Sequence, residues 1–490
     1  MDNSLKAFYS HYLKPALVWK HFAEICNIPH PSHSEEKIRQ YLVDFAVAHG
    51  IEHKVDEAGN VYMRKAATAG YEDRKGIVIQ AHMDMVPQKN NDKEFDFIND
   101  PIEAYIDGEW VTANGTTLGA DNGIGVAAIL AVMEDDTIEH GPIEGLITAT
   151  EETGMDGAFG LKGGLLQGDI LLNLDSETEG ELYVGCAGGV DVNGEMPYEP
   201  VSAPAEGYKA LELSVKGCKG GHSGIQIVCQ RANANKLLFR MLLAIEEQMD
   251  MKLASVDGGG LRNAIPREAV AVIMVKEADV EQAKSIVAEY EQKFVAEFAG
   301  VEDSIAVAVA DAAAPEVVMG AAKNLIRAIL ACFDGVYTMS MSMEGLVQTS
   351  NNLARVVSDN NVVKVQCLAR SSIRSEKEAL GSSIKAALEL GGFAVELSGA
   401  YDGWAPNMQS PILKAMLESY EALYGKKPAV TAIHAGLECG IIGSNYPGLD
   451  MISFGPTICY PHSPDEKVEI ASVEKFYDFL LHTLKNAPKK

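Results

Sequence analysis

Residues 145–152 read Gly-Leu-Ile-Thr-Ala-Thr-Glu-Glu, an apolar run that ends in two adjacent carboxylates, Glu151 and Glu152. The run predicts a buried strand. Similar patterns predict further strands at residues 76–80 and 169–174, and helices at residues 35–49 and 124–133. Buried strands that alternate with helices are typical of an α/β fold with a mostly parallel sheet covered on both faces.

The pattern changes after Gly185, where alternating strands and amphipathic helices indicate an α+β module with an antiparallel sheet. The predicted strands of this module are 207–217, 268–276, 304–310 and 361–369, and its predicted helices are 278–298, 316–333 and 375–391. The α/β pattern returns with a helix at 410–424, strands at 429–434 and 449–454, and a last helix from Ser472. We therefore predict a discontinuous domain of residues 1–186 and 404–490, interrupted by an inserted domain of residues 187–403.

Composition narrows the classes of function. A chain of 490 residues is long enough for two or more domains, and its net charge of −28 argues against binding to a phosphate backbone. The N-terminal residues lack the pattern of a signal peptide, and no apolar run is long enough to span a membrane. The eight cysteines lie singly, as a reduced compartment permits. We expect a cytoplasmic protein that binds neither nucleic acid nor membrane.

Potential metal ligands lie on both sides of the Glu151–Glu152 pair. They are His82, Asp84, Asp121, Asp175 and His462. Three candidates, His82, Glu152 and Asp175, fall at or just after the ends of predicted strands, where open α/β sheets bind their ligands. Imidazoles with carboxylates suit zinc or manganese, and two ions can share one carboxylate. These residues predict a metal-dependent hydrolase.

Seven motifs spread over nearly the whole chain resemble those of one enzyme family. They are His82-Met-Asp84, Gly119-Ala-Asp121-Asn-Gly, Glu151-Glu152-Thr-Gly154, Gly221-His222-Ser223-Gly224, Arg262-Asn263-Ala-Ile-Pro266, His434-Ala-Gly436-Leu-Glu438-Cys439-Gly440 and Pro461-His462-Ser463-Pro464-Asp465-Glu466. The chain resembles the aminoacyl-histidine dipeptidases, also called cytosolic non-specific dipeptidases or peptidase D, of the dizinc M20-type metallopeptidases. This resemblance implies a zinc-aminopeptidase-like catalytic domain with an inserted lid and dimerisation domain.

The resemblance also implies roles for the candidate ligands. Asp121 would bridge two divalent ions, most simply zinc, with manganese or cobalt as alternatives. His82 and Asp175 would complete one ion, and Glu152 and His462 the other. Asp84 would orient the imidazole of His82. Glu151 would be the general base.

The same resemblance implies that His222 of one subunit completes the site of the other subunit in a homodimer. Asn263, Arg370 and the backbone around Gly436 would anchor the C-terminus of a dipeptide substrate, since a guanidinium can bind a carboxylate with two hydrogen bonds. Two roles are open to Glu438, as a metal ligand or as a brace for the loop that carries Gly436. The resemblance further implies a cis peptide bond between Asp121 and Asn122.

Three classes of function follow. The first is a dimetal dipeptidase that cleaves unblocked dipeptides with broad specificity, Xaa-His dipeptides included. The second is an N-acyl amino acid deacylase or related amidohydrolase with the same metals. The third, a peptide-binding protein without activity, is disfavoured because it needs no general base beside a metal site.

Overall fold

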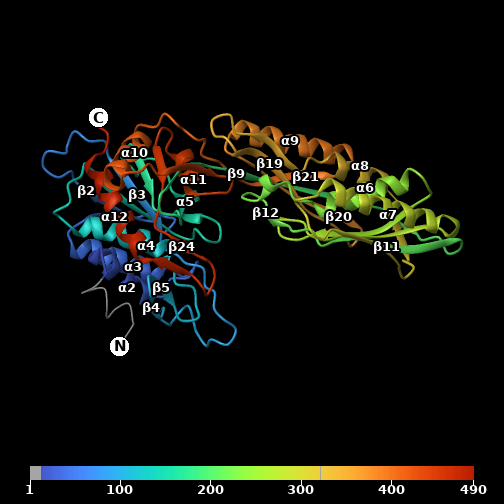
Figure 1. Ribbon diagram of the computed structural model, residues 1–490, viewed down its shortest axis with the longest axis horizontal. Helices are drawn as coiled ribbons and strands as arrows, with labels where there is room; N and C mark the ends of the chain where they lie inside the picture. The colour runs from blue at the N-terminus through green and yellow to red at the C-terminus, as the bar shows by residue number, and fades with distance from the viewer. Residues whose placement is uncertain (1–12, 321) are drawn as a thin grey trace. The chain divides into compact units, whose positions relative to one another are not determined.

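The computed structural model describes residues 13–320 and 322–490, which divide into two compact units (Figure 1). Unit 1 consists of the described residues up to Gly185 together with Pro406–Ala432 and Leu437–Lys490. Unit 2 consists of Cys186–Ala405 and the short segment Ile433–Gly436. The chain therefore leaves unit 1 twice, first for the long segment Cys186–Ala405 and then for the four residues Ile433–Gly436.

Unit 1 is built around a mixed sheet of eight strands. In spatial order the strands are β1 (Glu52–Val55), β2 (Val61–Lys65), β6 (Ile143–Thr148), β3 (Ile77–His82), β7 (Ile170–Asn173), β23 (Asp450–Ser453), β8 (Glu181–Cys186) and β22 (Ala429–Ile433). The four central strands β6, β3, β7 and β23 pair in parallel, as predicted. The pairs β1–β2, β2–β6 and β23–β8 are antiparallel, so the sheet is parallel only at its centre.

Seven helices of unit 1 are described. They are α2 (Ala16–Cys26), α3 (Glu36–Ala48), α4 (Ala120–Glu134), α5 (Asp156–Gly160), α10 (Pro411–Tyr424), α11 (Glu438–Asn445) and α12 (Ile470–Lys485). Helix α4 is almost wholly buried and contacts β3, and it packs closely on α2. A Cβ atom at Gly123 of α4 would lie 3.0 Å from the ring of Phe22 in α2, so glycine permits this close approach.

Local signals explain where helices begin and end. In α10, Ser410 caps the first turn because its Oγ accepts a hydrogen bond from the Leu413 N–H at 3.0 Å, and Pro411 opens the helix. The helix ends at Gly425, whose φ of +67° lies in the left-handed region.

A second sheet of unit 1 contains four short strands, β24 (Ile458–Cys459), β25 (Lys467–Glu469), β5 (Trp110–Ala113) and β4 (Ala104–Asp107).

Unit 2 contains a sheet of nine strands, and all the pairs described in it are antiparallel. In spatial order these are β16 (Ala306–Asp311), β11 (Tyr208–Lys216), β15 (Ala269–Lys276), β13 (Lys252–Gly259), β19 (Val347–Asp359), β20 (Val362–Ser371), β9 (Gly188–Pro197) and β21 (Ala394–Tyr401), with β18 (Gly335–Met339) paired to β19. Unit 2 also contains two separate two-stranded sheets, β10 (Pro200–Ser202) with β17 (Val317–Met319) and β12 (Gly221–His222) with β14 (Ala264–Ile265).

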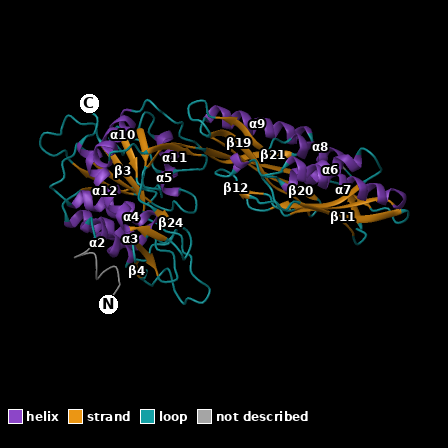
Figure 2. Ribbon diagram, viewed as in Figure 1, coloured by secondary structure: helices purple, strands orange, loops and turns teal. Residues whose placement is uncertain are grey.

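Four helices lie side by side along one face of this sheet (Figure 2). They are α6 (Ala234–Glu246), α7 (Val280–Glu297), α8 (Ala322–Ala331) and α9 (Arg374–Leu390). Their apolar faces and the sheet share one core, which contains Leu211, Phe239, Ile273, Phe294 and Leu388 among others. This arrangement is the predicted α+β module.

One predicted helix of unit 2 is partly wrong. The prediction ran from 316 to 333, but Val317–Met319 form strand β17, and the described helix α8 covers only Ala322–Ala331. Two adjacent β-branched residues, Val317 and Val318, favour the extended backbone, which β17 uses to pair with β10.

Candidate active site

His82 is the last residue of β3, and its buried imidazole faces two carboxylates. Its Nε2 lies 3.3 Å from Asp121 Oδ1 and 3.3 Å from Asp175 Oδ1. Its Nδ1 lies 3.1 Å from the backbone oxygen of Asp84 and 3.4 Å from Asp84 Oδ1. An imidazole that donates through Nδ1 presents the Nε2 lone pair to the opposite side, which is the arrangement of a metal-binding histidine.

Asp121 lies between the two candidate histidine ligands. While its Oδ1 faces His82, its Oδ2 lies 3.4 Å from His462 Nε2. The same His462 nitrogen is 3.0 Å from Glu152 Oε2. The structure therefore brings His82, Asp121, Glu152, Asp175 and His462 together, with one oxygen of the central carboxylate directed toward each imidazole.

The adjacent residues Glu151 and Glu152 are held through their backbone. Asp84 accepts hydrogen bonds from the N–H of Glu151 at 2.9 Å, the N–H of Glu152 at 3.2 Å and the hydroxyl of Ser32 at 2.8 Å. Burial favours the neutral form of Asp84, but these bonds and His82 hold its pKa at about 2. Thr150, just before the pair, has a φ of +55°, which turns the chain sharply after β6. Asp84 therefore positions both glutamates as well as His82.

The first residues of α4 depart from helical geometry, and the Asp121–Asn122 peptide bond is cis, as the resemblance implied. Asn122 donates a hydrogen bond from Nδ2 to Asp175 Oδ1. This contact links the first turn of α4 to Asp175, two residues beyond the end of β7.

Glu466 holds the loop before α4, a role that the motif analysis missed. Its buried carboxylate accepts hydrogen bonds from four consecutive backbone N–H groups, those of Leu118, Gly119, Ala120 and Asp121, at 2.7, 3.0, 2.8 and 3.2 Å. The only signal in the sequence was its position in the motif that contains His462.

Glu438 is also buried, at the start of α11. Its Oε2 accepts hydrogen bonds from Gln80 Nε2 at 2.6 Å and from Thr148 Oγ1 at 2.8 Å. These partners belong to β3 and β6, so Glu438 braces α11 against the centre of the sheet. Helix α11 begins two residues after Gly436, and the other carboxylate oxygen, Glu438 Oε1, is buried without a hydrogen-bond partner among the described residues.

The chemistry of the cluster fits a divalent cation. Burial and the neighbouring carboxylates raise the pKa of Asp175 to about 6, and burial with the nearby Asp175 raises that of Glu438 to about 7. Buried carboxylates repel one another in this way when no cation neutralises them. Glu152 Oε1 is buried without a hydrogen-bond partner among the described residues. Ligand atoms of His82, Asp121 and Glu152 lie within 4.8 Å of one another, and these three residues form a candidate metal site.

The other predicted site residues belong to unit 2, which contains His222, Asn263, Arg370 and Gly436. His222 pairs with Ala264, and the N–H of Ser223 donates to the backbone oxygen of Asn263 at 2.8 Å, so His222 and Asn263 are neighbours. Burial and the positive charge of Arg370 both lower the pKa of His222. His222, Asn263 and Arg370 therefore lie near one another within unit 2.

Hydrogen bonds determine the tautomer of His222. Its Nδ1 accepts from the backbone N–H groups of Gly224 and Ile225, each at 3.1 Å. A neutral imidazole that accepts at Nδ1 carries its proton at Nε2. His222 can therefore donate one hydrogen bond through Nε2.

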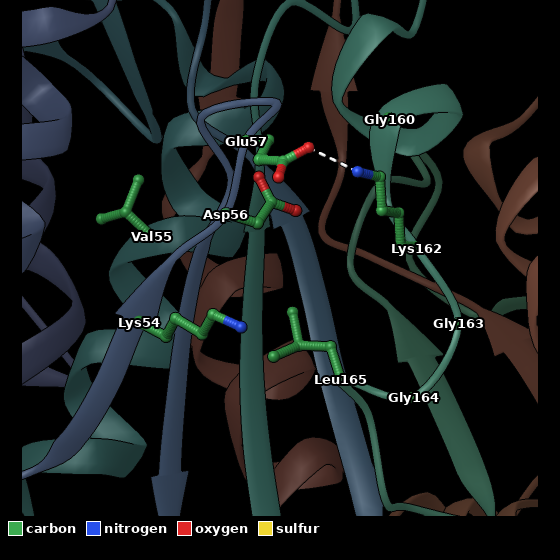
Figure 3. Close-up of a pocket in the computed structure, with 9 residues that line it drawn as sticks. All are labelled: Lys54, Val55, Asp56, Glu57, Gly160, Lys162, Gly163, Gly164 and Leu165. Carbon is green, nitrogen blue, oxygen red and sulfur yellow. Dashed lines mark hydrogen bonds and ion pairs between the residues drawn. The ribbon is translucent and has the colours of Figure 1, made fainter.

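Unit 1 also contains an open surface pocket of about 340 Å³ (Figure 3). It lies between the end of β1 and the loop around Gly163, and Glu57 and Lys162 form an ion pair across it. Its lining residues include none of the predicted site residues. This pocket is distinct from the candidate metal site.

In the part of the chain that the structure describes, no helix is both long enough and apolar enough to cross a membrane. Six of the eight cysteines are buried.

Comparison with known proteins shows the family to which the chain belongs. The sequence model described as "Peptidase family M20/M25/M40" matches residues 78–486. The cytosol non-specific dipeptidase of Escherichia coli (strain K12) is 48% identical over 480 residues, which cover 98% of this chain and 99% of that protein.

Solved structures extend the similarity to the fold. The aminoacylhistidine dipeptidase from Vibrio alginolyticus superposes with a TM-score of 0.94 at 46% identity, covering 99% of each chain. The aminopeptidase PepT from Bacillus cereus ATCC 10987 has a TM-score of 0.57 at 16% identity, covering 97% of this chain and 99% of that one, which shows the shared fold alone.

These findings define a peptide hydrolase. The chain belongs to peptidase family M20/M25/M40. The resemblance predicted from the motifs is confirmed, and the alternative of an N-acyl amino acid deacylase is not favoured.

Proposed function

We propose that this protein is a cytoplasmic metallo-dipeptidase that cleaves unblocked dipeptides of broad sequence, Xaa-His dipeptides included, with two divalent ions. The names of its relatives in Escherichia coli and Vibrio alginolyticus support the substrate class and the compartment. Zinc is the proposed metal because the ligand set combines imidazoles with carboxylates; manganese and cobalt are alternatives.

One observation supports the two-ion proposal above all others. Asp121 directs Oδ1 toward His82 and Oδ2 toward His462, at 3.3 and 3.4 Å. Asp175 lies beside the first histidine and Glu152 beside the second. In this proposal Asp121 is shared, and each pair of neighbours completes one ion.

Bound divalent cations would lower the pKa of water and polarise the peptide carbonyl. Glu151 is the general base in this proposal, taking a proton from the attacking water and returning it to the leaving amine. Burial and nearby carboxylates, Asp175 among them, raise the pKa of Glu151 well above its usual value. A raised pKa suits a group that accepts and then releases a proton near neutral pH. Asp84 keeps Glu151 in place through the Glu151 N–H.

His222 would stabilise the oxygen of the tetrahedral intermediate. Its neutral imidazole has Nδ1 occupied by two backbone N–H groups, and this leaves Nε2–H as the donor. A preorganised donor of this kind stabilises negative charge as it develops. We propose that His222 reaches the site of the partner subunit in a homodimer, and that unit 2 acts as the lid.

The substrate anchors of the proposal are Asn263, Arg370 and the backbone at Gly436. Arg370 is buried, with 5% of its surface exposed, and its planar guanidinium presents several N–H donors in a fixed fork. A buried guanidinium favours an anionic ligand such as the C-terminal carboxylate of a dipeptide.

Metal dependence and substrate choice can be tested together. The purified protein is stripped with a chelator, and its metal content is measured before and after zinc, manganese or cobalt is added back. Hydrolysis is then followed for a free dipeptide and for its N-acetylated form. We expect two ions per chain, loss and recovery of activity, and cleavage of the free dipeptide alone. Preferential cleavage of the acetylated dipeptide would identify a deacylase and overturn the proposal.

A further inference from the structure

Four residues of unit 2 stand in one row across the sheet. Ser350 of β19 pairs with Arg370 of β20, Arg370 pairs with Gly189 of β9, and Gly189 pairs with Tyr401 of β21. Paired residues on adjacent antiparallel strands project to the same face of a sheet. The side chains of Ser350, Arg370 and Tyr401 therefore share a face, with a glycine between the last two.

The glycine gives the tyrosine ring its place. A Cβ atom at Gly189 would lie 2.7 Å from Tyr401 Cε1 and 2.9 Å from Tyr401 Oη, closer than real Cβ contacts. The ring thus occupies the space above Gly189 and extends toward Arg370, whose Nη1 donates a hydrogen bond to Tyr401 Oη at 3.1 Å. A side chain at residue 189 would displace the phenol from the guanidinium.

The backbone around Tyr401 is held from the other side. The buried Lys377 of α9 donates to the backbone oxygen of Tyr401 and lies 3.1 Å from Asp402 Oδ1. Arg374 of the same helix donates from Nε to Asp402 Oδ1 at 3.0 Å. Two cationic side chains of α9 therefore fix the end of β21, and the phenol has little freedom to leave Arg370.

Arg370 has a donor without a partner. Its Nε is buried and makes no hydrogen bond within the described residues. A nearby carboxylate, Asp191, is already paired with Arg262 at 3.2 Å. A buried charged group with an unmet donor is unfavourable unless a ligand supplies the acceptor. Since Arg370 is a fork of five N–H donors, occupying one of them with the phenol leaves the others for an anion.

We propose that Tyr401 is a positioning residue that holds the Arg370 guanidinium in the orientation needed to bind the substrate carboxylate, with Gly189 providing the space for its ring. This inference rests on the proposed function, in which Arg370 anchors the C-terminus of a dipeptide. Tyr401 acts through Arg370 and does not itself touch the scissile bond.

The test compares Tyr401→Phe with the parent on two substrates, a dipeptide and the same dipeptide with a C-terminal amide in place of the carboxylate. Phenylalanine keeps the ring over Gly189 and removes only the acceptor. We expect the KM for the dipeptide to rise about 10-fold with kcat within about 2-fold, and the KM for the amide to remain that of the parent. Gly189→Ala should reproduce the rise because it displaces the ring. Tyr198→Phe, which removes a phenol just beyond the other end of β9, is the control and should match the parent.

Two results would overturn the inference while leaving the proposed function intact. One is an unchanged KM for the dipeptide in Tyr401→Phe. The other is an equal rise in KM for dipeptide and amide, which would show a structural role without a link to the carboxylate. A parent protein that cleaves no dipeptide would overturn the proposed function itself, and with it the role of Tyr401.

Discussion

The loop that carries Asp121 depends on one buried carboxylate, and Glu466→Gln tests that dependence. Glu466 Oε2 accepts from Leu118 and Gly119, and Oε1 accepts from Ala120 and Asp121. A glutamine has only one oxygen, so two of these four N–H groups lose their acceptor and face an NH₂ group instead. A buried donor left without a partner costs about 1–3 kcal/mol. We therefore expect a loss of about 2–6 kcal/mol of stability.

Tryptophan fluorescence can report this loss from unit 1 alone. The chain has three tryptophans, and in a Trp404→Phe background the remaining two, Trp19 and Trp110, both belong to unit 1. Urea unfolding of the metal-free protein is followed at about pH 8.5, where Glu466, whose pKa burial raises to about 7, is ionised. Asp465→Asn is the matched control because it changes a neighbouring exposed acid, and it should stay within about 0.5 kcal/mol of the parent.

Metal affinity supplies a second readout for Glu466→Gln. A displaced loop moves Asp121, and loss of a residue that orients a ligand weakens metal binding by about 10- to 100-fold. An unfolding midpoint and a metal affinity both equal to those of the parent would refute the reasoning, since the four hydrogen bonds would then contribute nothing.

Four further predictions follow from the site. Glu151→Gln should lower kcat at least about 10²-fold while metal content stays near that of the parent; a metal-free variant would make Glu151 a ligand instead. Asp121→Ala should bring metal content toward zero ions per chain, and retention of two ions with full activity would remove it from the site. Mixing His222→Ala with Glu151→Ala under subunit exchange should restore activity from two inactive parents; proven exchange without recovery would exclude donation of His222 across a dimer. Burial and Arg370 lower the pKa of His434 to about 3, so the stability that neutral His434 contributes above pH ~6.5 is lost as pH falls. Between pH 7 and 5, urea unfolding should show a loss about 2 kcal/mol larger in the parent than in His434→Gln, and equal losses in the two proteins would contradict this prediction.

The sequence predicted the metal-site candidates best where they follow parallel strands. His82 ends β3, Glu152 follows β6 and Asp175 follows β7, and these three strands are adjacent and parallel. Carboxyl ends of parallel strands meet at one edge of a sheet, so the strand pattern alone indicates that such residues gather. The same reasoning cannot place His462, because His462 lies in a loop and has a φ of +59°.

Contacts distant in sequence were the part that could not be predicted. Glu466 contacts residues that precede it by about 350 positions, and no local pattern encodes which backbone N–H groups a carboxylate will meet. The strand register that aligns Gly189 with Arg370 and Tyr401 is equally non-local. The overestimated helix at 316–333 has a simpler cause, because the apolar spacing of β17 continued into that of α8.

The charges around Arg370 are consistent with the binding of a single carboxylate. His434 is buried, and its Nε2 hydrogen-bonds to Ser350 Oγ at 2.7 Å. Burial first, and the charge of Arg370 second, lower the pKa of both His434 and His222, so both imidazoles are neutral at neutral pH. Neutral imidazoles add hydrogen-bonding capacity to this end of the sheet without adding positive charge. Among Ser350, His222, His434 and Arg370, Arg370 then carries the positive charge. One guanidinium matches one carboxylate in charge and in shape.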